Sequence, residues 1–244
     1  MSRRILVVGA GKSTSYLLDY FLEHSTEEDL EIIIADKNPG GIPENLQKHP
    51  HTEIIELDIS DVSNRKAQVN VADIVVSMLP PNLHLEVAKD CLEFGKNLVT
   101  ASYISEDMRQ LDGAVRKKGL VFMNEIGLDP GIDHMSAMQV IDRIRDDGGK
   151  MLLFESFTGG LLAPESDTNL WNYKFTWNPR NVVLAGRGKA AKFIQEGTYK
   201  YIPYHKLFRR TEFLKIKGYG TFEAYANRDS LSYREAYGLQ DALT

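Results

Sequence analysis

Short, β-branched apolar segments alternate with longer stretches of helical periodicity through the first half of the chain. This alternation is typical of βαβ units on a parallel sheet, whose strands are covered on both faces and are almost wholly apolar. The pattern predicts strands over residues 4–8, 31–35, 53–57, 73–78, 97–100 and 120–123. It predicts helices over residues 17–22, in a polar stretch up to residue 71, over 84–94, and over 106–117 with Ser105 as N-cap. The first half therefore predicts an α/β fold with a Rossmann-type doubly wound parallel sheet.

The pattern changes after Glu125. Residues 127–131 have the composition of a turn, and a helix with apolar Met138, Ile141 and Ile144 follows and closes at residues 148–149. Beyond that helix, a glycine-rich and aromatic sequence predicts strands over 151–157 and 221–226 around a helix near 182–194. We therefore expect a dinucleotide-binding Rossmann domain over residues 1–125 and a second, α+β domain over residues 126–244.

The Gly9-Ala10-Gly11 turn follows the first predicted strand and opens the first predicted helix. Glycines at such a turn let the backbone approach a pyrophosphate held at the helix N-terminus. The third position of the fingerprint holds Thr14 in place of glycine, while the flanking strand and helix are in register. A P-loop is excluded, because Leu6 stands where its first glycine is required. We expect Lys12 either to contact the pyrophosphate or to be exposed to solvent.

Asp36 at the end of the second predicted strand bears on the choice of coenzyme. A carboxylate there accepts hydrogen bonds from a ribose 2′-hydroxyl and repels a 2′-phosphate, which favours NAD over NADP. Lys37 and Asn38 leave NADP open, because a cation beside Asp36 is able to receive a phosphate. The alternative is that Asp36 is a plain turn residue. Further cofactor-lining residues are expected at the ends of the third and fourth strands: Leu57, Asp58, Ser77, Met78 and Leu79.

Composition and charge narrow the classes of partner. Hydrophobic residues make up 43% and charged residues 26% of the chain, a balance typical of globular proteins. The net charge of -5 gives no long-range attraction for nucleic acid, and we interpret the basic residues of segment 206–217 as a solvated face. The apolar run at the N-terminus stops after residue 8, too early for a signal peptide or a membrane span.

The cysteines and histidines exclude two further kinds of site. The single cysteine, Cys91, rules out an internal disulfide, fits the cytoplasm, and is expected to be a small buried hydrophobe. His49 and His51 form the only close histidine pair and have no further ligand-type residues nearby, so we expect no metal site.

Two motifs are far more specific than the glycine turn: Thr-Ala-Ser-Tyr-Ile-Ser at residues 100–105 and Met-Asn-Glu-Ile-Gly-Leu-Asp-Pro-Gly-Ile-Asp-His at residues 123–134. With the segments 159–165, 173–180 and 227–230, they resemble the glutamate-forming saccharopine dehydrogenases, also called saccharopine reductases. The resemblance runs over essentially the whole chain. It implies an NAD(P)-dependent oxidoreductase of lysine metabolism that interconverts saccharopine with L-glutamate and 2-aminoadipate 6-semialdehyde.

The resemblance also assigns roles to individual residues. It implies that Ser102, Tyr103 and Arg228 contact an amino-acid substrate, and that Leu128, Asp129 and Pro130 line the nicotinamide. Arg180 and Arg228 are candidate carboxylate clamps, since a guanidinium binds a carboxylate bidentately. Asp129 and Tyr103 are the candidate catalytic residues for proton transfer. By analogy the second domain binds substrate and supports a homodimer.

The chain also departs from the family, and other interpretations remain open. Thr158 stands where the family has a cysteine, and the family continues past Thr244, so we expect an incomplete substrate domain. The family also usually binds NADP with a basic residue after the second strand. The rival functions are an imine-forming oxidoreductase acting on a carboxylated polyamine of the carboxynorspermidine type, and a non-catalytic nucleotide-binding fragment that needs a second chain. Taken singly, Ser102 and Tyr103 could end a strand, Asp129 could cap a helix, and Arg228 could form a surface ion pair.

Overall fold

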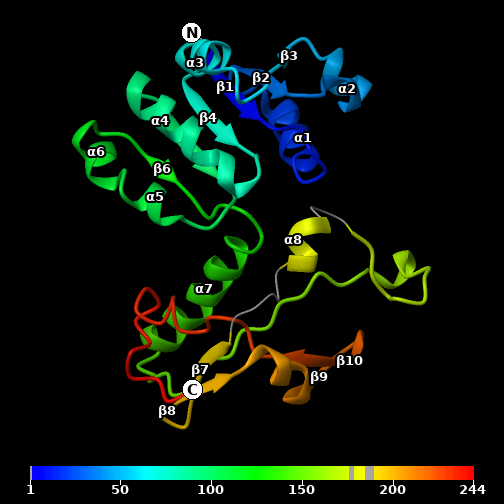
Figure 1. The fold of residues 1–244 in the computed structure, drawn as a ribbon, viewed down its shortest axis with the longest axis vertical. Helices are drawn as coiled ribbons and strands as arrows, with labels where there is room; N and C mark the ends of the chain where they lie inside the picture. Colours follow the sequence, from blue (N-terminus) through cyan, green and yellow to red (C-terminus); the bar gives the residue numbers. More distant parts are fainter. Residues whose placement is uncertain (1, 176–178, 185–189) are drawn as a thin grey trace. The chain divides into compact units, whose positions relative to one another are not determined.

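The computed structural model describes residues 2–175, 179–184 and 190–244 (Figure 1). The chain divides into two compact units, Met1–His134 and Met135–Thr244. The first unit contains a six-stranded sheet in the order β3-β2-β1-β4-β5-β6, and every neighbouring pair in it is parallel. Its strands are β1 (Arg3–Val8), β2 (Leu30–Asp36), β3 (Thr52–Glu56), β4 (Ile74–Ser77), β5 (Asn97–Thr100) and β6 (Phe122–Met123). This order confirms the doubly wound Rossmann-type sheet.

Helices cover both faces of this sheet (Figure 1). On one face, Val69 of α3, Val87 of α4 and Met108 of α5 share a core with the strands. On the other face, Leu18 of α1 and Leu46 of α2 complete a second core. The helices are α1 (Ser15–His24), α2 (Glu44–Gln47), α3 (Val62–Val71), α4 (His84–Phe94), α5 (Glu106–Arg109) and α6 (Asp112–Lys117), with 3-10 turns η1 (Pro39–Gly41) and η2 (Pro81–Leu83). Burial on both faces explains why the strands are continuous apolar runs.

The helix predicted over residues 106–117 is divided into α5 and α6. Its predicted N-cap is confirmed, because the Ser105 hydroxyl accepts a hydrogen bond from the backbone N–H of Met108 at 3.1 Å. The division follows from a tightened turn, in which the N–H of Leu111 donates to the carbonyl of Met108. The side chains of Met108 and Leu111 pack onto the same core, and the shorter helical turn places both of them there.

The second unit holds two separate antiparallel hairpins. Its elements are the C-terminal part of α7 (Ile132–Asp146), η3 (Pro164–Ser166), α8 (Pro179–Leu184), β7 (Ala191–Gln195), β8 (Thr198–Ile202), η4 (Tyr204–Arg209), β9 (Thr211–Ile216) and β10 (Gly220–Tyr225). β7 pairs with β8, and β9 pairs with β10. The helix predicted after residues 127–131 and the strand predicted over 221–226 are therefore confirmed. Of the helices described, none has both the length and the apolar character that crossing a membrane requires.

Two predictions in the second unit are wrong. Residues 151–157 form no strand; the N–H of Phe154 donates to the carbonyl of Thr244, and the Phe154 side chain packs on the small core around Ile141. The helix predicted near residues 182–194 ends at Leu184; residues 185–189 lie outside the described residues, and β7 occupies the remainder. The physical reason is a hairpin turn at Glu196 and Gly197, whose φ angles of 52° and 71° suit a tight two-residue turn.

Candidate dinucleotide-binding and active site

The glycine turn lies at the carboxyl end of β1, where the strand order of the sheet reverses. Gly9 has a φ of 100°, and a Cβ there would lie 3.0 Å from the backbone oxygen of Met78 at the end of β4. A Cβ on Gly11 would meet open space. The buried Thr14 hydroxyl donates to the Gly9 carbonyl at 3.1 Å, and this bond closes the turn where the fingerprint has its third glycine. The turn thus leaves its outer surface open to a ligand, while Lys12 beside it is exposed.

The carboxylate of Asp36 is directed at this turn. Its Oδ2 accepts the backbone N–H of Ala10 at 2.7 Å, and its Oδ1 accepts the backbone N–H of Asn38 at 2.8 Å. Two backbone donors therefore hold this carboxylate against the turn, where it keeps its negative charge. Asp36 joins the end of β2 to the glycine turn, a structural role that the sequence analysis did not foresee.

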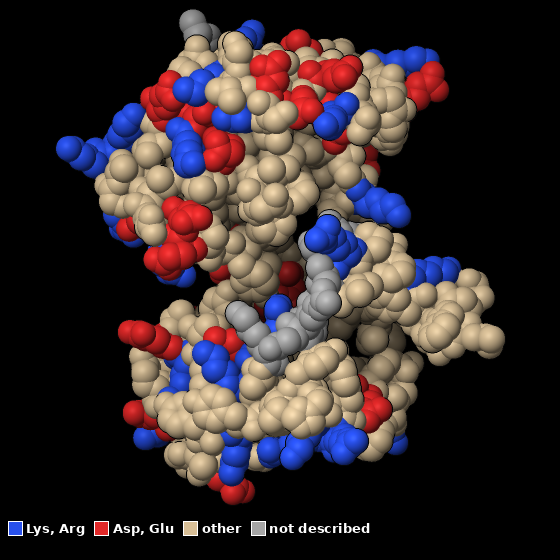
Figure 2. Space-filling model, viewed as in Figure 1, with Lys and Arg blue, Asp and Glu red and all other residues tan. Residues whose placement is uncertain are grey.

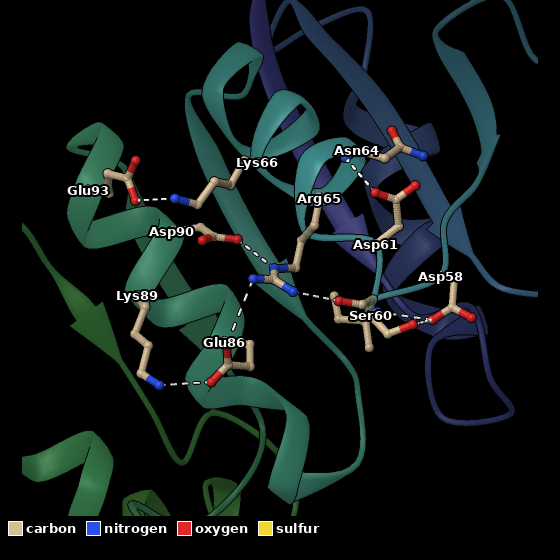
Figure 3. Close-up of polar contacts among 11 residues, drawn as sticks. Asp58, Ser60, Asp61, Asn64, Arg65, Lys66, Glu86, Lys89, Asp90 and Glu93 are labelled. Carbon is tan, nitrogen blue, oxygen red and sulfur yellow. Dashed lines mark hydrogen bonds and ion pairs between the residues drawn. The ribbon is translucent and has the colours of Figure 1, made fainter.

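Lys37 and Asp58 form an ion pair between the carboxyl ends of β2 and β3, with 2.7 Å between Nζ and Oδ2. The Asp58 carboxylate also accepts hydrogen bonds from the N–H and hydroxyl of Ser60 (Figure 3). Lys37 and these donors lower the pKa of Asp58, and Asp58 in turn raises the pKa of Lys37. Leu57, just before Asp58, is buried. An exposed cation thus stands beside the position where the sequence analysis expected the ribose to bind.

A buried ion pair supports the loop that carries Asp58. Nε of Arg65 on α3 donates to Oδ2 of Asp90 on α4 at 2.5 Å, and their side chains are only 5% and 3% exposed (Figure 3). Nη1 of the same guanidinium donates to the carbonyl of Ile59 at 2.5 Å. Glu86 lies 3.8 Å from Arg65 and completes the acidic side of this cluster. This ion pair was not predictable from the sequence, because Arg65 and Asp90 lie on different helices and share no local pattern.

A chain of buried polar groups joins the end of β4 to the segment after β5. The Ser77 hydroxyl lies 2.8 Å from Nδ1 of His84, and Nε2 of His84 lies 2.8 Å from the Ser102 hydroxyl. Ser77 is fully buried and His84 is 4% exposed. Ser77 thus contacts His84, whereas Met78 and Leu79 pack partly against the two cores of the sheet. His84 was missed, since a lone histidine at a helix start carries no sign that it bridges two strand ends.

Tyr103 and Asp129 are brought together from the two specific motifs. The Tyr103 hydroxyl donates to Oδ1 of Asp129 at 2.7 Å, and both residues are exposed. Neighbouring Leu128 is 72% exposed, and Pro130 is buried. The side chain that accepts a backbone N–H at the start of α7 is Asp133, bonded to Gly131 at 2.7 Å. Asp129 therefore faces Tyr103, and Asp133 takes the helix-capping position that was the alternative for Asp129.

The segment 124–134 is fixed to the end of β5 by its own polar side chains. The Thr100 hydroxyl donates to Oδ1 of Asn124 at 3.0 Å, and Oε1 of Glu125 accepts the N–H of Ile104 at 3.0 Å. The N–H of Glu125 donates to the carbonyl of Ser102. These bonds hold the two motifs side by side, so the distance between Tyr103 and Asp129 is set by backbone contacts as well as by their own hydrogen bond.

The two candidate carboxylate clamps lie in the second unit. Arg180 is exposed at the start of α8, and Arg228 is exposed after β10, where its carbonyl accepts the N–H of Lys192. The ion pair at this place joins Lys192 to Asp229 at 2.7 Å. Trp177, which belongs to the resembling segment 173–180, lies outside the described residues.

Surface charge and potential metal ligands bear on the classes of ligand other than a nicotinamide coenzyme. On the face of the first unit that Figure 2 shows, acidic and basic side chains are interspersed, with no basic stripe of the kind that follows a nucleic-acid backbone. Among the described residues, no group of three or more His, Cys, Asp and Glu side chains is placed to hold a metal ion.

Family comparisons cover both units. Residues 5–123 match the family described as "Saccharopine dehydrogenase NADP binding domain", and residues 127–244 match "Saccharopine dehydrogenase C-terminal domain". These descriptions favour NADP, and they do not support the preference for NAD that was predicted from Asp36. Both Asp36 oxygens accept backbone N–H groups and the exposed Lys37 ammonium follows in the chain, so Asp36 does not decide the coenzyme by itself.

Individual relatives also belong to the saccharopine dehydrogenases or to the related semialdehyde synthases. The chain is 36% identical over 241 residues to the NADP-dependent, L-glutamate-forming saccharopine dehydrogenase of Pyricularia oryzae, covering 99% of the chain and 52% of that protein. It is 33% identical to the alpha-aminoadipic semialdehyde synthase of Arabidopsis thaliana, covering 98% of the chain and 24% of that protein. The apo structure of the L-glutamate-forming enzyme of Saccharomyces cerevisiae superposes with a TM-score of 0.89 at 32% identity, over 100% of the chain and 54% of that structure. The chain spans about half the length of these saccharopine dehydrogenases.

Proposed function

Because this chain belongs to the saccharopine dehydrogenase family, we propose that it binds NADP in its first unit and interconverts saccharopine with L-glutamate and 2-aminoadipate 6-semialdehyde. The observation that carries the proposal is the hydrogen bond between Tyr103 and Asp129. It joins the two most specific motifs at the carboxyl edge of the sheet, the edge on which the glycine turn also lies. Ligands of doubly wound sheets bind outside this edge.

The chemistry needs a hydride acceptor and a group that moves protons. In the oxidative direction a bound nicotinamide coenzyme would supply the acceptor for a hydride from the carbon beside the secondary amine, and the loss of that hydride would leave an imine on the substrate. Water adds to the imine carbon, its oxygen becomes the aldehyde oxygen, and the C–N bond breaks to release glutamate. The Asp129 carboxylate would accept the proton from the attacking water. The Tyr103 hydroxyl, which donates to Asp129, would give its proton to the leaving nitrogen and recover one from Asp129.

Substrate binding needs donors for several carboxylates. We assign this role to Ser102, Tyr103, Arg180 and Arg228. Hydroxyl and guanidinium donors both form charge-assisted hydrogen bonds with carboxylates, and a guanidinium does so bidentately. These assignments are supported by residue type and by the resemblance of the motifs.

The direct test follows the absorbance of reduced nicotinamide when saccharopine is added with NADP or with NAD. It uses this chain alone and this chain joined to the part of the S. cerevisiae relative that it does not cover. Formation of NADPH together with glutamate supports the proposal in either format. Absence of turnover in both formats would overturn the reaction, and turnover only of a carboxylated polyamine would assign it to the other imine-forming class.

Replacing Tyr103 with phenylalanine should lower kcat by about a hundredfold to ten-thousandfold, the range expected when one proton-transferring group is removed. The ring is retained, so NADP affinity should stay unchanged. Steady-state rates and coenzyme titration by fluorescence measure the two effects. Tyr199→Phe, which removes the hydroxyl of an exposed tyrosine on β8, serves as the matched control. A normal kcat in Tyr103→Phe would remove the tyrosine from the mechanism.

We also propose that Lys37 receives the 2′-phosphate of NADP, exchanging its ion pair with Asp58 for the ligand. The ammonium is exposed at the carboxyl end of β2, and both oxygens of the neighbouring Asp36 are engaged by the backbone. Replacing Lys37 with alanine should weaken NADP binding about tenfold to hundredfold, the value of one hydrogen bond between charged groups, and leave NAD binding unchanged.

The control for Lys37→Ala is Lys66→Ala, which removes an ammonium that pairs with Glu93 at 2.6 Å on the surface of α3 and α4. This variant should bind both coenzymes as the unaltered chain does. Titration with NADP and NAD gives the ratio of the two dissociation constants for each variant. If the ratio of the NADP and NAD dissociation constants is unchanged in Lys37→Ala, another group binds the 2′-phosphate.

A further inference from the structure

The hydrogen-bonded chain Ser77–His84–Ser102 is not used by the proposed reaction, yet it ends on a residue assigned to substrate binding. We propose that His84 is a positioning residue: its Nε2–H donates to the Ser102 hydroxyl oxygen, so that the Ser102 hydroxyl hydrogen is directed outward to a carboxylate of the substrate. The identity of that ligand rests on the proposed function. The direction of the hydrogen bonds rests on the described contacts and on the neutral state of the buried imidazole.

The first step concerns the protonation state of His84. Burial lowers its pKa from the ordinary value, so the imidazole is neutral at neutral pH. A neutral imidazole has one N–H donor and one acceptor nitrogen. Each ring nitrogen lies 2.8 Å from a serine hydroxyl, so one serine must donate to the imidazole and the other must accept from it. Either Ser77 donates to Nδ1 and Nε2–H donates to Ser102, or Ser102 donates to Nε2 and Nδ1–H donates to Ser77.

The second step uses the burial of Ser77 to choose between these directions. Ser77 is completely buried, and among the described residues the partner of its hydroxyl is Nδ1 of His84. If Nδ1 carried the hydrogen, the Ser77 hydroxyl would accept it, and its own hydrogen would be left without an acceptor inside the protein. A buried donor without a partner is strongly disfavoured. Ser77 therefore donates to Nδ1, and the hydrogen of the imidazole lies on Nε2.

The third step follows the chain to its open end. With the hydrogen on Nε2, the Ser102 hydroxyl oxygen is an acceptor, and its own hydrogen is available to another group. Ser102 is only half-buried and precedes Tyr103, whose hydroxyl faces Asp129. A fixed hydroxyl donor at this point suits an anionic oxygen, because hydrogen bonds to carboxylates are charge-assisted. In the opposite tautomer, the Ser102 hydroxyl would donate its hydrogen to His84. Only its oxygen lone pairs would then face the substrate, and these repel a carboxylate.

Nitrogen NMR of the unaltered chain tests the direction directly. The two imidazole nitrogens of a neutral histidine have distinct chemical shifts according to which one carries the hydrogen. We expect His84 to be a single Nε2–H tautomer at neutral pH, with Nδ1 in the acceptor state. A predominant Nδ1–H tautomer, or a mixture of both forms in exchange, would overturn the proposal. This measurement needs neither a variant nor catalytic activity, so it stands even if saccharopine is not the substrate.

Two variants of His84 test the consequence for substrate binding. The amide nitrogen of glutamine lies where Nε2 lies in histidine, whereas that of asparagine lies where Nδ1 lies. His84→Gln therefore keeps a donor to Ser102, while His84→Asn loses it. We expect His84→Asn to raise KM for saccharopine about tenfold more than His84→Gln, the size of one hydrogen-bond loss, with KM for NADP unchanged in both.

The control His205→Gln alters an exposed histidine in η4 and should leave both KM values unchanged. Thermal midpoints of all variants show whether folding is affected. Equal KM values for saccharopine in the glutamine and asparagine variants would overturn the positioning role, because a purely structural histidine does not distinguish the two. If the unaltered chain does not turn over saccharopine in either format of the direct test, the proposed function fails. The tautomer measurement alone then decides the inference.

Discussion

Replacing Gly9 with alanine is expected to weaken NADP binding about tenfold to hundredfold, the size of one weakened hydrogen bond to a charged group. The physical cause is local. Gly9 has a φ of 100°, and an added Cβ would lie 3.0 Å from the Met78 oxygen and 3.1 Å from the Met78 carbon. Both atoms are backbone atoms of the neighbouring strand end, so the turn must move. The backbone that is expected to approach the pyrophosphate moves with it.

The same substitution should destabilise the first unit by about 1–3 kcal/mol, the cost of holding a side chain in a strained backbone conformation. Gly11→Ala separates the two effects, because a Cβ there meets nothing within 4 Å and the stability should be unchanged. It should nevertheless weaken NADP binding, since the Cβ occupies space that the pyrophosphate needs. Thermal melting and coenzyme titration measure both quantities for each variant.

Gly113→Ala is the control for a glycine unrelated to the turn. Gly113 lies in α6, has free space around its Cβ position, and should gain about 0.5–1 kcal/mol of stability, as alanine does in a helix. Its NADP affinity should equal that of the unaltered chain. If Gly9→Ala binds NADP as tightly as Gly113→Ala does, the glycine turn is not the pyrophosphate site.

The sheet of the first unit was predictable because its signal is local. Ile32, Ile33 and Ile34 follow one another in β2 because both faces of that strand are buried, and no amphipathic helix contains such a run at its surface. The glycine turn after the first strand and the helical periodicity that follows it then indicated that strands and helices alternate in βαβ units. The burial of the strands in the two cores repeats what the sequence pattern predicted.

The second unit was less predictable because its strands have mixed polarity and pair only in hairpins. β7 contains Lys192 and Gln195 beside Phe193, so its pattern does not distinguish a strand from a helix. Residues 151–157 are apolar for another reason: Met151 and Phe154 pack on the core around Ile141 without a pairing strand. Their backbone instead meets the end of the chain, a contact that no local window contains.

The candidate site shows the same division. The motifs containing Tyr103 and Asp129 marked the residues that the structure brings within 2.7 Å, because a resemblance carries long-range information. The role of Asp36 could not be predicted, since it depends on where the backbone N–H of Ala10 points after the turn is formed. His84 has a partner seven residues before it and another eighteen residues after it, and neither spacing belongs to a recognised pattern.

Removing the charge of Asp90 by Asp90→Asn should cost about 3–5 kcal/mol of folding stability, because the buried Arg65 guanidinium loses the carboxylate 2.5 Å from it and keeps only the half-buried Glu86 carboxylate, 3.8 Å away, as a counter-charge among the described contacts. The two side chains are 5% and 3% exposed, so water does not replace the lost partner. Arg65 also donates to the Ile59 carbonyl, and Ile59 adjoins Asp58, the partner of Lys37. We therefore expect a weaker NADP affinity together with the loss of stability. Chemical denaturation and coenzyme titration measure the two effects.

Two comparisons show whether burial is the cause. Glu93→Ala breaks the exposed pair with Lys66 on the same two helices and should cost less than about 1 kcal/mol. The double variant Arg65→Met with Asp90→Leu removes both buried charges, so it should recover most of the stability that Asp90→Asn loses. It should not recover all of it, because the Ile59 carbonyl then lacks its donor, at a cost of about 1–3 kcal/mol. If Asp90→Asn is no less stable than Glu93→Ala, the buried pair does not hold α3 against α4, and the support of the Asp58 loop must come from elsewhere.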